Sequence, residues 1–128
     1  MAYVKRHAVA VTTDASGDVT AYTPAVNGFV HAVMYEPDGS SPLATGADIT
    51  VTGSVSAIPV VTVTNLGTSA VAKYPRDATA DVADAASLYA AAGEPVEARI
   101  PVADESVKIV VAQGGNAKSG TFHVYIEG

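Results

Sequence analysis

The sequence contains no cysteine and no tryptophan, and only two of its 128 residues are phenylalanine. Without cysteine there are no disulfides and no thiolate metal sites, and the redox compartment stays open because cysteine-free proteins occur on both sides of a membrane. The absence of tryptophan weakens the case for a sugar-binding cleft, which normally displays aromatic rings. A core built from Val and Ala buries less apolar area than one built from Leu and Phe, so we expect an isolated copy to be only modestly stable.

Positive charge is also scarce. Seven Lys and Arg stand against thirteen Asp and Glu, and the formal net charge is −6. Because phosphate binding is carried by clustered Lys and Arg, and these are scattered, we expect no nucleic-acid partner. The apolar run 8–11, which follows Lys5 and Arg6, is too short for a secretion signal or a membrane span. The sequence therefore predicts synthesis in the cytoplasm, no export address and no membrane partner.

Apolar residues, by contrast, are plentiful. They make up 48% of the chain while charged residues make up 16%, and the mean hydropathy is positive. A single domain spanning residues 1–128 has one small core, which cannot hold all of this apolar surface. The surplus predicts an interface, and we expect a homo-oligomer, either a dimer or a trimer.

Most of the chain has the pattern of short strands separated by turns. Extended segments rich in Val, Thr and Ile are expected at 3–13, 18–23, 29–36, 48–54, 58–64, 70–74, 96–102, 106–113 and 121–127. The residues at 14–17, Asn27-Gly28, 36–39 and 65–67 are turn signals. The last two extended segments are predicted to form a C-terminal hairpin around the loop 114–120.

Two of these segments show which side chains face inward. In 121–127, Phe122, Val124 and Ile126 alternate with polar residues, as in a half-buried strand. In 29–36, one side is predicted to carry Phe29, His31, Val33 and Tyr35, and the other Val30, Ala32 and Met34. Both sides of this second segment are largely apolar, which is typical of a central or sandwiched strand.

One stretch departs from the β pattern. Residues 78–92 are rich in Ala, and Gly93 stands where a helix would end, so one short helix or an ordered loop is expected there. Pro101 places the following strand at a sheet edge or marks a strand end. Since crossover helices are missing elsewhere, the pattern predicts a mainly β protein, an antiparallel β-sandwich that is jelly-roll-like.

Candidate reactive groups do not form a recognisable motif. His7, His31 and His123 lie on separate strands without the short paired spacing of a metal site, so cross-strand packing or solvent exposure is favoured. A helix through Asp77, Asp81 and Asp84 would show an acidic face, which is typical of solvated helices. The loop 114–120 has the letters of a phosphate loop in the wrong order, and nothing nominates Ser119 as a nucleophile. We therefore expect no enzyme activity, no cofactor and no bound metal.

Tyrosine and arginine are the residues best suited to a protein contact, because Tyr is amphipathic and Arg makes directional ion pairs. The candidate interface residues are Tyr22, Tyr35, Tyr74, Arg76, Tyr89, Arg99 and Tyr125.

Six phrases of the sequence have a common style, namely 12–17 (TTDASG), 21–24 (AYTP), 42–49 (PLATGADI), 100–105 (IPVADE), 111–118 (VAQGGNAK) and 120–125 (GTFHVY). Together they resemble a group of small structural proteins of tailed bacteriophages, over most of the chain. Several small β-rich members of that class are capsid decoration, or cement, proteins that sit as dimers or trimers on the major capsid shell. The resemblance implies a virion protein on the capsid surface, with the major capsid protein as partner.

Two alternatives stay open. Other phage proteins of similar size and composition join the head to the tail or build the tail. A carbohydrate-binding module on the virion surface is a further alternative, from a different functional class.

Overall fold

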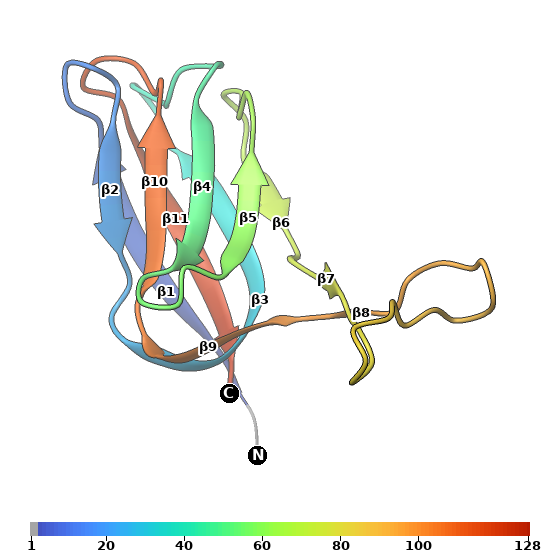
Figure 1. Ribbon diagram of the computed structural model, residues 1–128. Coiled ribbons are helices and arrows are strands. Elements are labelled where there is room, and N and C mark those ends of the chain that lie inside the picture. Colours follow the sequence, from blue (N-terminus) through green and yellow to red (C-terminus); the bar gives the residue numbers. More distant parts are fainter. Residues whose placement is uncertain (1–2) are drawn as a thin grey trace.

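The computed structural model describes residues 3–128, and its regular secondary structure is entirely β (Figure 1). The strands are β1 (Val4–Thr12), β2 (Val19–Tyr22), β3 (Val26–Pro37), β4 (Asp48–Gly53), β5 (Pro59–Val63), β6 (Val71–Lys73), β7 (Asp77–Ala78), β8 (Glu97–Ala98), β9 (Ile100–Glu105), β10 (Val107–Ala112) and β11 (Ser119–Glu127). Over this range the structure has no helix that could span a membrane.

The strands form two packed antiparallel sheets. Sheet A has the order β1-β11-β3-β6, with β9 pairing along the same edge of β3 as β6, and sheet B has the order β2-β10-β4-β5. Figure 1 shows sheet B in front of sheet A, with a segment containing β7 and β8 reaching away from both. The mainly β fold and the antiparallel sandwich predicted from the sequence are confirmed.

The core lies between the two sheets and follows their cross-strand register. Residues directly opposite each other on neighbouring strands share a face. The central inward row of sheet A is Val9–Phe122–Tyr35–Val71, and the facing row of sheet B is Ala21–Ile109–Val51–Val61. The inward positions predicted for Phe122, Val124 and Ile126 are confirmed, since all three are buried.

The predicted C-terminal hairpin is wrong. The strand β10 pairs with β2 and β4 in sheet B, whereas β11 pairs with β1 and β3 in sheet A, so residues 113–118 cross between the layers. Hydrogen bonds fix this crossing, because Thr13 Oγ1 accepts from Lys118 N at 2.9 Å and Gly114 N donates to Gly17 O at 2.8 Å. Each of these two strands has one apolar face. Because the strands lie in different sheets, both apolar faces point into the core between the sheets.

The predicted turn at Asn27-Gly28 is also wrong, because these residues lie inside β3. Gly28 has a φ of +134°, and a Cβ there would collide with the carbonyl oxygen of Glu127. The ability of glycine to adopt a positive φ is therefore used in a β-bulge in the pairing with β9, and not in a turn.

A second bulge in β3 changes the predicted faces of that strand. Tyr125 pairs with Ala32 and Ile126 with Val30, so His31 is the extra residue. Val33 and Tyr35 point into the core as predicted, but Phe29 and His31 do not join them: Phe29 is exposed, and His31 lines an outer depression with Ala32. Strict alternation fails because a bulge adds one residue to one strand only.

Residues 78–92 form an ordered loop, and the helix alternative is wrong. Asp81 Oδ1 accepts hydrogen bonds from the N–H groups of Ala83 and Ala85, at 2.8 and 3.0 Å, which stabilises a turn. Such side-chain capture of the backbone competes with helix formation. The edge position predicted from Pro101 is confirmed, since β9 pairs with β3 alone.

Candidate interaction surfaces

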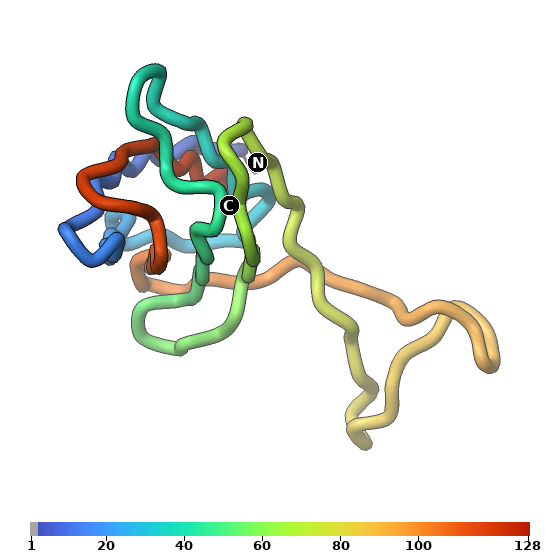
Figure 2. The backbone as a smooth tube through the Cα atoms, turned by 90° about the horizontal axis from the view of Figure 1, so that it is seen from above, coloured from blue at the N-terminus to red at the C-terminus, as the bar shows by residue number. Residues whose placement is uncertain are grey.

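The most unusual feature of the molecule is a long excursion between β6 and β9, which we call the arm and define as residues 74–99. Figures 1 and 2 show it running away from the sandwich, and no residue from 76 to 99 is buried. Val82 is fully exposed, Tyr89 is 77% exposed and Leu88 is 41% exposed. Apolar side chains on a segment without a core of its own mark a contact surface.

The arm is nevertheless ordered by its own hydrogen bonds. The short pair β7 and β8 forms its base, with Asp77 opposite Ala98 and Ala78 opposite Glu97. Beyond this base lie two tight turns. In the first, Asp81 N donates to Ala85 O at 2.8 Å, and in the second, Tyr89 N donates to Glu94 O at 3.1 Å. The second turn presents Leu88 and Tyr89 beside Glu94 at one tip of the arm.

Between Arg76 and Arg99, which stand at its two ends, the arm carries charge of one sign. Residues 77–98 contain five acidic residues and no Lys or Arg, the acids being Asp77, Asp81, Asp84, Glu94 and Glu97. The expected helical acidic face does not exist, because no helix forms. The carboxylates are instead distributed over the base and both turns, so the arm suits a partner surface with positive charge.

The outer face of sheet A is the second candidate surface. One cross-strand row on this face reads Ala8–His123–Met34–Ala72, and it crosses β1, β11, β3 and β6. The corresponding outer row of sheet B reads Thr20–Val110–Thr50–Thr62. Threonine is suited to a strand face that is in contact with water. The sheet A row, by contrast, consists of two alanines, a methionine and a histidine, and the histidine is its one polar side chain. The contrast makes the outer face of sheet A a candidate contact surface.

A depression of about 240 Å³ lies on this outer face, next to the base of the arm. It is lined by His31, Ala32, Met34, Ala72, Tyr74 and Tyr125. The rings of His31 and Tyr74 meet edge to face at 6.2 Å. Within residues 3–128, the Nδ1 atoms of His31 and His123 are buried without a hydrogen-bond partner. The depression is therefore largely apolar, with aromatic walls suited to an apolar side chain.

Positive charge gathers beside the depression. Arg99 forms an ion pair with Glu127, and its guanidinium lies 5.2 Å from the ring centre of Phe29. The hydrogen bond from Arg99 holds the pKa of Glu127 below its usual value, and the charges of Arg99, His31 and Arg76 act in the same direction. Two guanidinium groups thus lie close enough to this corner to act on the Glu127 carboxylate.

The structure divides the candidate interface residues into three groups. Tyr74, Arg76, Tyr89 and Arg99 belong to the arm, and Tyr125 lines the depression beside it. Tyr22 is exposed on the outer face of sheet B, away from both surfaces. Tyr35 is only 2% exposed, packs its ring 5.3 Å from that of Phe122 and accepts the Leu43 N–H at 3.1 Å. Its placement on an interface is therefore corrected: it is a core residue whose pKa is raised by burial.

Sequence reasoning missed the other residues of the outer face, above all Met34, Ala72 and His31. The sequence did contain a sign of this apolar outer face, because both sides of the segment 29–36 are largely apolar. The prediction for this segment is a central or sandwiched strand: β3 is central in sheet A, between β11 on one edge and β6 and β9 on the other, but it is not sandwiched, because the described residues form two layers.

No metal or nucleotide site emerges from the described residues. They contain no group of three or more His, Asp or Glu side chains that could hold a metal ion. His7 lies in the same inward cross-strand row as Val124 and Val33, while His123 is on the opposite face of the sheet. The loop 114–120 connects the two sheets, and a strand follows it, which is not the arrangement of a phosphate loop.

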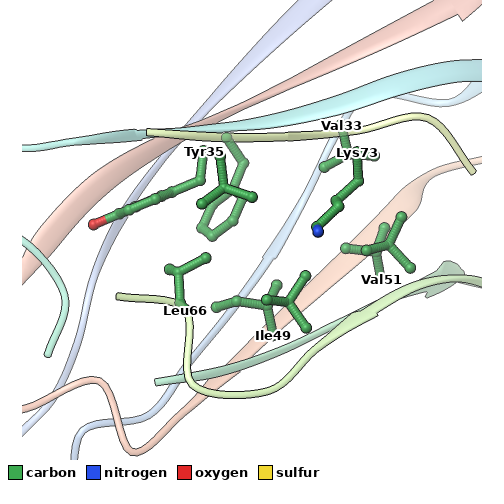
Figure 3. A pocket seen from close by; sticks show the side chains of 10 residues that line it. Val33, Tyr35, Ile49, Val51, Leu66 and Lys73 are labelled. Carbon is green, nitrogen blue, oxygen red and sulfur yellow. The ribbon is translucent and has the colours of Figure 1, made fainter. Parts of the chain in front are cut away.

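An apolar slot opens between the sheets at the edge formed by β5 and β6 (Figure 3). Val33, Tyr35, Ile49, Val51 and Leu66 line it, and Lys73 covers it with its aliphatic stem. Its free volume is about 10 Å³, roughly that of one water-sized probe. The slot is a packing gap in the sandwich and has no room for a small-molecule ligand.

One carboxylate has a structural role that the sequence did not reveal. Glu105 is 7% exposed, and its Oε1 accepts from Ser56 N and Val55 N at 3.0 Å each and from Ser56 Oγ at 3.1 Å. These bonds fasten the turn between β4 and β5 to the end of β9. The hydrogen bonds, led by that from Ser56 N, hold the pKa of Glu105 below its ordinary value.

We expect this carboxylate to make stability depend on pH. A lowered pKa in the folded state stabilises the fold above the unfolded pKa, about 4.3 for Glu, and this contribution is lost as the pH falls through the folded value. Thermal unfolding from pH 7 to pH 3 should show a steeper loss of stability below pH 4 for the natural protein than for Glu105→Gln. Asp38 and Glu127 also have lowered pKa values, so the difference between the two curves isolates Glu105. Parallel curves would contradict this role.

Comparison with known proteins adds little. No family model matches the chain, and no curated protein sequence matches it. It is similar to one solved structure, described as "Crystal Structure of FLHE", with a TM-score of 0.49 and 13% sequence identity over 98% of this chain and 96% of that one. A likeness this distant carries no argument about function.

Proposed function

We propose that the protein is a structural component of a tailed-phage particle: a capsid decoration protein that self-associates, binds the major capsid protein and has no catalytic role. The arm is the observation that carries this proposal. Fixing each backbone residue costs about 1–2 kcal/mol in conformational entropy, and residues 76–99 bury no side chain in return. Contacts with a partner would offset that cost, so the arm is best understood as a connecting device.

The outer face of sheet A supports the same proposal from a second direction. Its apolar row and the adjacent depression leave apolar side chains exposed in an isolated copy. When a partner covers this face, its apolar area is removed from water, which stabilises both the assembly and the subunit.

The assignment to a phage capsid rests on the resemblance of the six sequence phrases, and the physics of decoration fits this chain. A protein that bridges neighbouring capsid subunits binds sites that are already fixed in space, so weak individual contacts are strengthened by multivalency. A net charge of −6 suits the outside of a shell, away from packaged DNA.

The arm also favours one alternative, a head-to-tail joining or tail component. An arm that reaches from one subunit to the next makes a head-to-tail contact, and such contacts generate closed rings or open tubes. A decoration protein would give dimers or trimers that bind a shell, whereas a joining or tail component would give six-fold rings or tubes by itself.

Two measurements test the proposal. Light scattering on the purified full chain is expected to give a dimer or trimer, and the protein is expected to co-sediment with shells assembled from the cognate major capsid protein. A monomer that does not bind shells would refute the proposal. Six-fold rings in negative-stain images would replace it with the joining or tail function.

A further inference from the structure

We propose that the arm of one copy docks on the outer face of sheet A of a second copy, with Leu88 and Tyr89 in the depression beside Tyr74 and Tyr125. This inference rests on the proposed self-association and adds the two surfaces that meet. Because the arm tips and the receiving face are different parts of the chain, two copies can exchange arms reciprocally as a dimer, or several copies can dock head-to-tail in a ring.

The apolar chemistry of the two surfaces matches. The second turn of the arm offers one aliphatic and one aromatic side chain, Leu88 and Tyr89, both exposed. The depression offers aromatic and thioether walls from Tyr74, Tyr125 and Met34. A tyrosine that enters such a site keeps its hydroxyl free for a polar partner while its ring is buried, which is why Tyr is enriched at protein contacts.

The charges match as well. The arm carries five carboxylates and no cation between residues 77 and 98. The receiving corner carries Arg76 and Arg99 against Glu127, and Arg6 stands exposed on the outer face of β1. Glu94, at the same turn as Tyr89, would face this positive corner. Complementary charges of this kind fix the register of a contact and speed its formation.

A second copy is the occupant that satisfies both surfaces at once. In Figures 1 and 2 the arm runs away from its own sandwich, so its tips do not lie over the outer face of sheet A in the same chain. Every copy therefore presents one unpartnered arm and one unpartnered face. A head-to-tail contact uses both in each subunit, and it closes into a ring when the rotation between subunits allows.

Cysteine cross-linking tests this contact directly, because the chain has no cysteine of its own. The double variant Ala72→Cys/Ala90→Cys places one thiol in the depression and one at the arm tip, and leaves Leu88 and Tyr89 intact. Mild oxidation should link copies into covalent dimers and larger species on a denaturing gel. The matched control Thr62→Cys/Ala90→Cys moves the first thiol to the outer face of sheet B and should give at most a trace.

A second measurement reads affinity. Tyr89→Ala should raise the Kd of self-association by roughly tenfold or more, as for a buried aromatic anchor. Tyr22→Ala removes an exposed tyrosine from sheet B and should leave the Kd within about twofold.

The outcomes separate this inference from the proposed function. If the full chain self-associates but Ala72→Cys/Ala90→Cys links no better than its control, the inference fails and self-association stands. If added capsid shells, and not other copies, protect a single Ala72→Cys thiol from alkylation, the face binds the shell and the inference fails. If the full chain is a monomer at every concentration, the inference fails, and if that monomer also does not bind shells, the proposed function itself fails.

Discussion

Excising residues 79–96 is expected to turn the self-associated protein into a monomer while leaving the sandwich folded. The excised residues contain no buried side chain, so their loss removes no core packing. Their removal eliminates Val82, Leu88 and Tyr89, the apolar side chains that the arm exposes. Light scattering over a range of concentrations should show the loss of oligomer, and thermal unfolding should change little, apart from any stabilisation that the oligomer itself supplied.

The register of the arm base makes this excision feasible. Ala78 lies opposite Glu97 in the antiparallel pair of β7 and β8. A two-residue Asn-Gly turn is a favoured connection between antiparallel strands and can join these two residues directly. The matched control replaces the loop tip 115–117 with Gly residues, which alters an unrelated loop. An excised protein that stays oligomeric would show that the arm is not the connecting device.

Phe122→Ala is expected to lower the free energy of unfolding by about 3–5 kcal/mol, the usual range for a buried phenylalanine. Phe122 is 2% exposed and occupies the middle of the inward row Val9–Phe122–Tyr35–Val71. Its cross-strand neighbours are Val9, which is too short to fill the resulting cavity, and Tyr35, whose hydroxyl is held by the Leu43 N–H. Urea denaturation monitored by circular dichroism measures the change.

Two comparisons make the Phe122 result interpretable. Tyr22→Ala removes an aromatic ring of similar size that is 53% exposed, and it should change stability by about 0.5 kcal/mol or less. The slope of the free energy with denaturant should stay the same, because both variants keep the fold. A loss below about 1 kcal/mol for Phe122→Ala would mean that the core re-packs around the gap more freely than close packing allows.

Several elements of the fold were predictable because they depend on local geometry. Alternation along 121–127 placed Phe122 in the core since successive side chains on a strand point to opposite faces. Pro101 predicted an edge strand because proline has no N–H to donate, and β9 is indeed an edge. Of the candidate interface residues, Tyr74, Arg76, Tyr89 and Arg99 lie on the arm, and their role at an interface stays a prediction.

Other elements were not predictable because they depend on which strands meet. Whether 106–113 and 121–127 pair with each other or join opposite sheets is decided by partners far away in the sequence, such as Thr20 opposite Val110. Tyr35 was assigned to an interface because tyrosine is common both in cores and at protein contacts. Its burial follows from packing against the facing sheet and from the hydrogen bond that its hydroxyl accepts from the Leu43 N–H. The outer face of sheet A required the register of four strands before its apolar row became visible.

The sequence by itself determined the β class, the inward side of the strand 121–127, the scarcity of positive charge and the excess of apolar residues, because these are properties of composition and of a period of two. The tertiary structure decided that Asn27-Gly28 is a bulge, that residues 113–118 cross between layers and that residues 74–99 leave the sandwich as an arm. These features depend on contacts between distant segments. A bulge is defined by the pairing of one strand with its neighbour, and the arm is defined by a core that other segments form without it.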